Sequence, residues 1–254
     1  IGLGGDPVRA RAHPGPVSGT ANMATFPDGQ PPVMNMGLVS STNRHTAFDA
    51  DVVFHEYVHG LTNRLVGGRL NPHALDEPQS SGMGEGWSDY YALTVTSFAT
   101  GNEKVVTGDW VVKNSQGIRL APYDDNYPTK FGGIGSFTDE HDVGEVWCAA
   151  LMMMTRKARQ ALGNDQDGYR ICWQIVTDGL KLTPANPSFL DARDAILLAL
   201  DQLKDAGRVS TETHQLVRRA CWEAFARFEM GVNASSNGPA LEGVVADTAL
   251  PADL

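Results

Sequence analysis

Two histidines four residues apart, His55 and His59, are the residues whose types and spacing most directly suggest chemistry. On an α-helix, positions i and i+4 lie one above the other, so both imidazole rings can reach a single metal ion. Glu56 projects to one side of that pair, where its carboxylate could accept a proton from a water on the metal. The pattern therefore predicts a zinc site with a general base beside it.

A catalytic zinc ion takes a third protein ligand, which is often a carboxylate from elsewhere in the fold. Glu85 and Asp89 stand four residues apart in a segment with a helical pattern. We predict that Glu85 binds the metal and that Asp89 accepts the remaining ring N–H of His55, which would fix the tautomer of that histidine. The alternative is that the two carboxylates only favour the amino terminus of a helix. The two-histidine pattern can itself occur by chance on a polar helix face.

Helices must hold these ligands, and the apolar periodicity predicts them. The first spans residues 49–65 and ends at Gly67 and Gly68, with an apolar stripe opposite the two histidines at Val53, Tyr57, Leu61 and Leu65. Glycines and Ser or Asp caps bound further helices at residues 84–101, 139–162, 167–182, 189–206 and 211–229, the last two capped by Ser188 and Ser210. Residues 102–138 are expected to be irregular.

The amino-terminal part differs in composition from the rest of the chain. Residues 1–45 are rich in Gly, Pro, Ser and Asn and predict a strand at 33–39 and an extended stretch at 21–25. The sequence thus predicts an α+β fold. Residues 1–68 form a small strand-containing part that ends in the first helix, residues 69–232 form a mainly helical subdomain, and residues 233–254 form a loose tail.

Composition excludes several classes of protein. The net charge of −10 opposes binding to nucleic acid or to an anionic membrane surface, which need clustered Lys and Arg. No run approaches the roughly 18 apolar residues of a membrane-spanning helix, so we expect a soluble protein. Cys148, Cys172 and Cys221 lie in helical patterns, which favours three core residues over one disulfide with a free thiol.

Longer strings around these residues resemble the fungalysin family of secreted metalloendopeptidases, which are relatives of thermolysin. The most specific strings are HEYVHGLTNRL at residues 55–65 and GMGEGWSD at residues 82–89. Further similarity lies in ANMAT at 21–25, PDGQ at 27–30 and HDVGEVW at 141–147, so that the match spans about residues 5–230. The resemblance implies a thermolysin-like zincin fold, a catalytic zinc ion and hydrolysis of internal peptide bonds with Glu56 as the general base.

The resemblance also implies roles for residues outside the metal site. His141 matches the histidine that stabilises the charged tetrahedral intermediate, although a surface histidine that caps a helix is the alternative. Arg119 occupies the place of an arginine that holds a substrate carbonyl, with an exposed loop arginine as the alternative. Ala21 and Asn22 lie in the stretch that would pair with an extended peptide substrate. His13, His45, His73 and His214 remain without a role.

Two departures from the family pattern leave questions open. Residues 60–84 contain no tyrosine, so any phenol donor must come from elsewhere, and Tyr123 and Tyr127 are candidates that could equally just pack. The chain also begins where the catalytic domain of the family is already under way, which implies further strands and an inhibitory propeptide ahead of it. A zinc-binding but inactive fragment is therefore an alternative, and an acidic helical interaction module is a more distant one.

Partners and a second metal follow from the same reasoning. The resemblance implies protein or peptide substrates, a propeptide before activation, secretion and a monomeric protein. Calcium stays undecided, because the clusters at residues 124–126 and 164–167 offer oxygen ligands but resemble solvated turns or helix caps.

Overall fold

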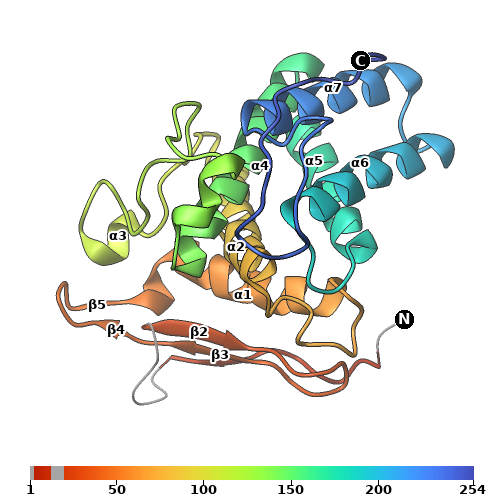
Figure 1. Cartoon of the computed structure of the whole chain (residues 1–254). Helices are drawn as coiled ribbons and strands as arrows, with labels where there is room; N and C mark the ends of the chain where they lie inside the picture. Colours follow the sequence, from red (N-terminus) through yellow and green to blue (C-terminus); the bar gives the residue numbers. More distant parts are fainter. Residues whose placement is uncertain (1–2, 13–19) are drawn as a thin grey trace.

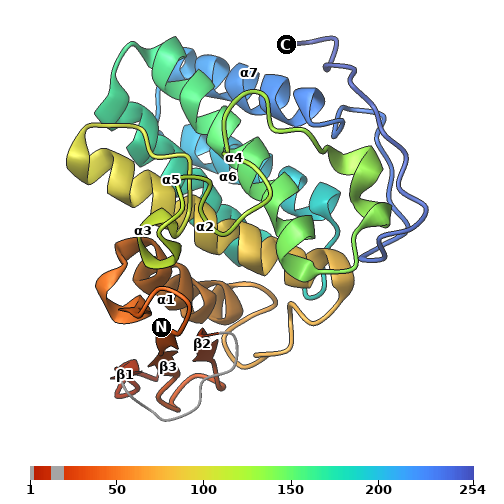
Figure 2. The ribbon, with the colours of Figure 1, turned by 90° about the vertical axis from the view of Figure 1, so that its left-hand side faces the viewer.

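A small layer of strands lies against one side of helix α1, and the longer helices lie on the other side (Figure 1, Figure 2). The computed structural model describes residues 3–12 and 20–254, so His13 lies outside the described residues. The chain passes through the strands first and through the helices afterwards, which confirms the predicted α+β fold with a helical carboxyl-terminal part.

The strands form two small sheets. Strands β1 (Arg9–Arg11), β3 (Val33–Met36) and β2 (Ala21–Ala24) are neighbours in that order, with β1 parallel and β2 antiparallel to β3. The predicted strand at 33–39 was wrong in its extent, because β4 (Leu38–Val39) leaves the first sheet and pairs with β5 (Arg44–His45). The break falls at Gly37, whose backbone N–H donates to Thr46 Oγ1 and whose carbonyl accepts from the Thr46 N–H.

Helix α1 (Ala50–Leu65) follows the short 3-10 helix η1 (Thr46–Phe48), and Asp49 caps it by accepting from the Asp51 N–H. The apolar stripe opposite the histidines is only partly buried, since Tyr57 is 54% exposed while Val53 and Leu65 pack against buried side chains. The buried face carries polar side chains and packs on α2, whose Glu85 and Asp89 contact His55. The buried residues of α1 are Asp51, Val52, His55, Glu56, Val58 and Thr62.

Helix α2 (Pro78–Thr100) begins six residues earlier than the predicted start at residue 84. Ser80 and Glu77 form a reciprocal capping box, and Pro78 occupies the first helical position, where its missing N–H costs nothing. Gly84, which suggested the helix start, and Gly86 lie inside the helix. Gly86 allows the close approach of the neighbouring backbone.

Close packing of α2 against α4 (Glu140–Leu162) forms the centre of the molecule. A Cβ atom on Gly86 would lie 2.4 Å from the carbonyl oxygen of Gly144, so the two backbones touch where both side chains are absent. Trp87 and Trp147 meet edge to face beside this contact, with ring centroids 5.7 Å apart. The contact brings Glu85 of α2 close to the start of α4.

The remaining helices are α5 (Asp165–Leu182), α6 (Phe189–Asp205) and α7 (Thr211–Arg227), close to their predicted ranges. Ser188 and Ser210 cap α6 and α7 as predicted. The segment between α2 and α4 is mostly irregular but contains the short α3 (Asp109–Val112) and the 3-10 helix η2 (Phe131–Ser136). All three cysteines are buried and unbonded, as core residues would be.

The tail after residue 232 has no helix or strand, but it is not loose. Buried Gln79 of α2 donates from its side-chain amide to Ser236 Oγ and to the carbonyls of Gly238 and Ala240. In Figure 1 the tail accordingly runs along the helical part before it reaches the carboxyl terminus. Among the helices of the described residues, none combines the length and the apolar composition that crossing a lipid bilayer requires.

Candidate metal centre and active site

The side chains of His55 and His59 on α1 and of Glu85 on α2 converge between the two helices. His55 Nε2 lies 3.1 Å from His59 Nε2 and 3.1 Å from Glu85 Oε2, and His59 Nε2 lies 3.3 Å from Glu85 Oε1. A tetrahedral zinc ion with bonds of about 2.0–2.1 Å holds its ligand atoms about 3.3 Å apart. Glu85 Oε2 is also buried and has no hydrogen-bond partner among the described residues. The three residues therefore fit zinc.

Electrostatics at this point favour a cation. Burial alone would raise the pKa of Glu85, but His59 and His55 hold it well below its ordinary value. Burial opposes a charge on His55, yet the hydrogen bond with Asp89 and the nearby carboxylate of Glu85 outweigh burial and raise the pKa of His55 to about 10. Burial lowers the pKa of His59 to about 4, so that its imidazole stays neutral and keeps a lone pair for a metal.

Asp89, one helical turn after Glu85, lies behind the histidines and is almost fully buried. Its Oδ1 lies 2.7 Å from His55 Nδ1, so the N–H of that ring nitrogen points away from the metal position and Nε2 points toward it. Arg119 Nε and Tyr123 Oη donate to Oδ2 at 2.7 Å and 2.6 Å. Burial would raise the pKa of Asp89, but Arg119 and His55 hold it far below its ordinary value.

Glu56 lies beside the metal position, on the cavity wall and only 7% exposed. Burial raises the pKa of its carboxyl to about 7, against the opposing effect of a charged His55. A carboxyl whose pKa lies near neutrality can both accept and return a proton.

His141, in the first turn of α4, lies on the rim of the same cavity. Its Nε2 is 3.4 Å from Glu85 Oε2, and its side chain is 45% exposed. Asp139 caps α4 and accepts from the backbone N–H of His141, while the same Oδ1 lies 2.7 Å from His141 Nδ1. One carboxylate thus orients the ring and leaves Nε2 toward the cavity.

Arg119 is buried in the cavity wall, so the alternative of an exposed loop arginine was wrong. Its side chain is 9% exposed, and Nε and Nη2 donate to the two oxygens of Asp89. Tyr123 and Tyr127 do not line the cavity, and their hydroxyl groups donate to Asp89 and Glu145.

The cavity at the candidate metal centre has a volume of about 530 Å³. Ala21 and Asn22 lie in its lining, on β2, which is an edge strand of the described sheet. Another part of the lining is apolar and comes from the start of α1, from α3 and from the segment before Arg119. Its residues are Val52, Val111, Val112 and Ile118.

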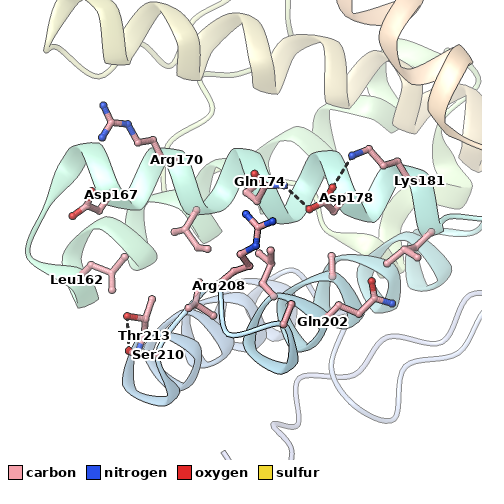
Figure 3. Close-up of a pocket in the computed structure, with 16 residues that line it drawn as sticks. Leu162, Asp167, Arg170, Gln174, Asp178, Lys181, Gln202, Arg208, Ser210 and Thr213 are labelled. Atoms are coloured by element: carbon pink, nitrogen blue, oxygen red, sulfur yellow. Dashed lines mark hydrogen bonds and ion pairs between the residues drawn. The ribbon is translucent and has the colours of Figure 1, made fainter. Parts of the chain in front are cut away.

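A larger cavity, of about 1040 Å³, lies elsewhere, between α5, α6 and the start of α7. Figure 3 shows its lining, in which Gln174 and Lys181 contact Asp178 of α5. None of the sequence-predicted site residues lies there. Size alone therefore does not locate the chemistry of this molecule.

The clusters that left calcium undecided are occupied by other interactions. Asp125 pairs with Arg156, Asp165 pairs with Arg159, and Asn164 caps α5. Within residues 3–12 and 20–254, only one group of three or more His, Cys, Asp or Glu side chains is close enough to share a metal ion. It consists of His55, His59 and Glu85.

Sequence reasoning missed two residues that organise the site. Asp139 stands two residues before His141 at a predicted helix start, and this capping position was a usable signal. Glu145 stands one helical turn after His141, within the string that carried the resemblance, but its partners come from a distant loop and leave no local pattern.

Two helices that present a pair of histidines and a glutamate beside a small sheet define a zincin. A family model described as fungalysin metallopeptidase (M36) matches residues 1–234, and the chain belongs to this family.

Curated relatives agree with that assignment. The chain is 35% identical to extracellular metalloproteinase 3 of Arthroderma gypseum over 92% of its own length and 38% of that protein. It is also 35% identical to extracellular metalloproteinase 10 of Coccidioides posadasii, over 93% of its length and 39% of that protein. For extracellular metalloproteinase 3 of Trichophyton soudanense the identity is again 35%, over 92% of this chain and 62% of the relative. The chain thus spans about two fifths of the length of the first relatives.

Proposed function

We propose that this protein is a zinc-dependent endopeptidase that hydrolyses internal peptide bonds, with Glu56 as the general base. The observation that carries the proposal is the triangle of His55, His59 and Glu85 donor atoms, 3.1–3.3 Å apart, with the carboxylate of Glu56 on the same cavity wall. Extracellular relatives support secretion of the protein that contains this chain.

Bound zinc would supply a Lewis acid that polarises the scissile carbonyl and makes a water molecule more acidic. Glu56 takes the proton from that water and passes it to the amine that leaves. His141, oriented by Asp139, donates a hydrogen bond to the oxygen on which negative charge develops. Asp89 holds His55 in the tautomer that presents Nε2 to the metal.

Substrate contacts follow from the cavity walls. Arg119 binds a backbone carbonyl of the peptide, and strand β2, which carries Ala21 and Asn22 at the edge of the described sheet, pairs with the extended peptide backbone. The apolar wall of Val52, Val111 and Ile118 accepts a hydrophobic substrate side chain.

The test compares the zinc-loaded chain with Glu56→Gln, using zinc content, thermal unfolding and casein hydrolysis. Glutamine keeps the shape of the side chain but cannot take a proton, so zinc content and stability should persist while turnover falls by about a hundredfold or more. Glu223→Gln, on α7 and paired with Lys157, is the matched control and should behave as the wild type.

Two outcomes contradict the proposal in different ways. Undiminished turnover by Glu56→Gln removes that residue from the role of base. Stoichiometric zinc without casein hydrolysis by the wild-type chain identifies a zinc-binding but inactive piece of the peptidase.

A further inference from the structure

The segment that carries Arg119 is held by two buried carboxylates, one on α2 and the other on α4. Asp89 on α2 accepts from the Arg119 guanidinium and from Tyr123 Oη. Glu145 on α4 accepts from the backbone N–H of Leu120 and, at 2.8 Å, from Tyr127 Oη. The donors alternate along the chain between the two carboxylates.

The contact of Glu145 with Leu120 fixes the main chain directly after Arg119. The two oxygens of Glu145 lie 2.9 Å and 3.1 Å from the Leu120 nitrogen, and Glu145 is only 2% exposed. The side chain of Leu120 is 59% exposed, so side-chain packing contributes little to its position. The hydrogen bond from the backbone is therefore the anchor at this point.

Arg119 needs both ends fixed to point at a ligand. Asp89 holds the guanidinium end through Nε and Nη2, which leaves Nη1 as the nitrogen for a substrate carbonyl. A shift of the main chain at residues 119–120 would rotate the guanidinium about Asp89 and move Nη1 from its place in the cavity wall.

We propose that Glu145 is a positioning residue, which sets the direction of Arg119 toward the substrate by holding the Leu120 main chain. Tyr127 takes part by bonding the second side of the Glu145 carboxylate, and its ring stacks on Tyr123 with centroids 5.8 Å apart. The inference rests on the proposed function, which gives Arg119 its contact with the substrate.

Three variants of the zinc-loaded chain test the inference through peptide hydrolysis. Glu145→Gln keeps one acceptor but loses the charge, and Tyr127→Phe removes one bond to Glu145. Tyr91→Phe is the control, because it deletes a similar buried hydroxyl, bonded at 2.7 Å to Thr177, away from this loop. The first two should raise KM by about three- to tenfold with kcat little changed, since a lost carbonyl contact weakens ground and transition states alike.

A merely structural role gives a different pattern. General destabilisation lowers the active fraction and hence the apparent kcat, and it leaves KM unchanged. That pattern in Glu145→Gln, or equal effects in Tyr127→Phe and Tyr91→Phe, overturns the inference.

Combination with Arg119→Lys shows whether Glu145 acts through Arg119. Lysine keeps the positive charge beside Asp89 but lacks the forked geometry of the guanidinium. In that background Glu145→Gln should cause no further rise in KM, nor in the Kd of a peptide whose scissile amide is replaced by a reduced CH₂–NH bond. If the increases in KM caused by Arg119→Lys and by Glu145→Gln multiply in the double variant, the inference is contradicted.

NMR provides a readout that needs neither turnover nor peptide binding. The Leu120 amide should exchange with solvent at least about tenfold faster in Glu145→Gln than in the wild type, and the Arg119 Nε–H resonance should shift. An unchanged Nε–H resonance overturns the inference whatever the activity. The proposed function fails separately, through absent zinc or absent turnover in the wild-type chain.

Discussion

Gly86 allows a direct test of how helix packing places Glu85, the proposed third metal ligand. In Gly86→Ala the new Cβ atom would lie 2.4 Å from the carbonyl oxygen of Gly144, 3.0 Å from Trp147 Cβ and 3.1 Å from the backbone nitrogen of Cys148. A carbon–oxygen contact needs about 3.3 Å, so α2 and α4 must separate by nearly 1 Å at this point. Both obstructing backbone atoms belong to α4, where no flexible side chain can move aside.

Gly84→Ala is the matched control, because Gly84 flanks Glu85 on its other side. Its added Cβ would meet only Leu75 Cδ1, at an ordinary 3.7 Å. Both substitutions gain the same helix propensity of about 1 kcal/mol, so the difference between them isolates the packing cost. Overpacking costs about 1–3 kcal/mol, which predicts that Gly86→Ala unfolds several degrees below Gly84→Ala.

Metal binding should respond along with stability. Separation of the helices moves Glu85, which lies next to position 86, and the start of α4 with His141, so zinc affinity should fall about tenfold in Gly86→Ala only. Thermal unfolding of the zinc-free chain and competition with a chromophoric chelator measure the two effects. Equal unfolding temperatures and equal zinc affinities in the two variants would refute the packing argument.

Three further predictions concern metal, orientation and pH. Chelation of zinc should lower stability by about 4 kcal/mol relative to free zinc at a thousand times its Kd, and an unchanged unfolding temperature contradicts the proposed ligand set. Asp139→Asn should keep the cap of α4 but lower kcat about tenfold, because the ring of His141 loses its carboxylate partner; unaltered kcat speaks against that orienting role. Burial raises the pKa of Asp51 to about 6, so this group contributes stability that is complete below pH 4 and is lost as the pH rises through 6. The free energy of unfolding of Asp51→Asn, measured in urea, should therefore rise relative to that of the wild type by up to about 3 kcal/mol between pH 4 and 7. If the free energies of the two proteins change with pH in parallel, the effect is excluded.

The three residues of the candidate metal site could be picked out because their pattern is local. His55 and His59 share a helix, so the 3.6-residue period alone places both rings on one side. Glu85 and Asp89 likewise share a helix face, and only the joining of the two faces needed the structure. The caps Ser188 and Ser210 were readable for the same reason.

Features that depend on neighbouring elements were not predictable. The stripe through Tyr57 stays partly exposed, because α2 covers the polar face of α1 instead, where Glu85 and Asp89 contact His55. Gly84 suggested a helix start, whereas it lies inside α2, where Gly86 permits the close approach of α4. Neither outcome can be derived from one helix alone.

The burial of a polar helix face links stability to chemistry in this fold. Glu56, His55 and Asp89 are each less than 10% exposed, and charged or polar groups so placed are destabilising unless every one has a partner. Asp89 is the hydrogen-bond partner of His55 and of Arg119. Glu85 Oε2, in contrast, has no hydrogen bond among the described residues. A metal ion satisfies that oxygen and both histidine nitrogens at once. Zinc should therefore act here as part of the contact between α1 and α2 as well as a reagent, and variants that loosen this contact should lose affinity and stability together.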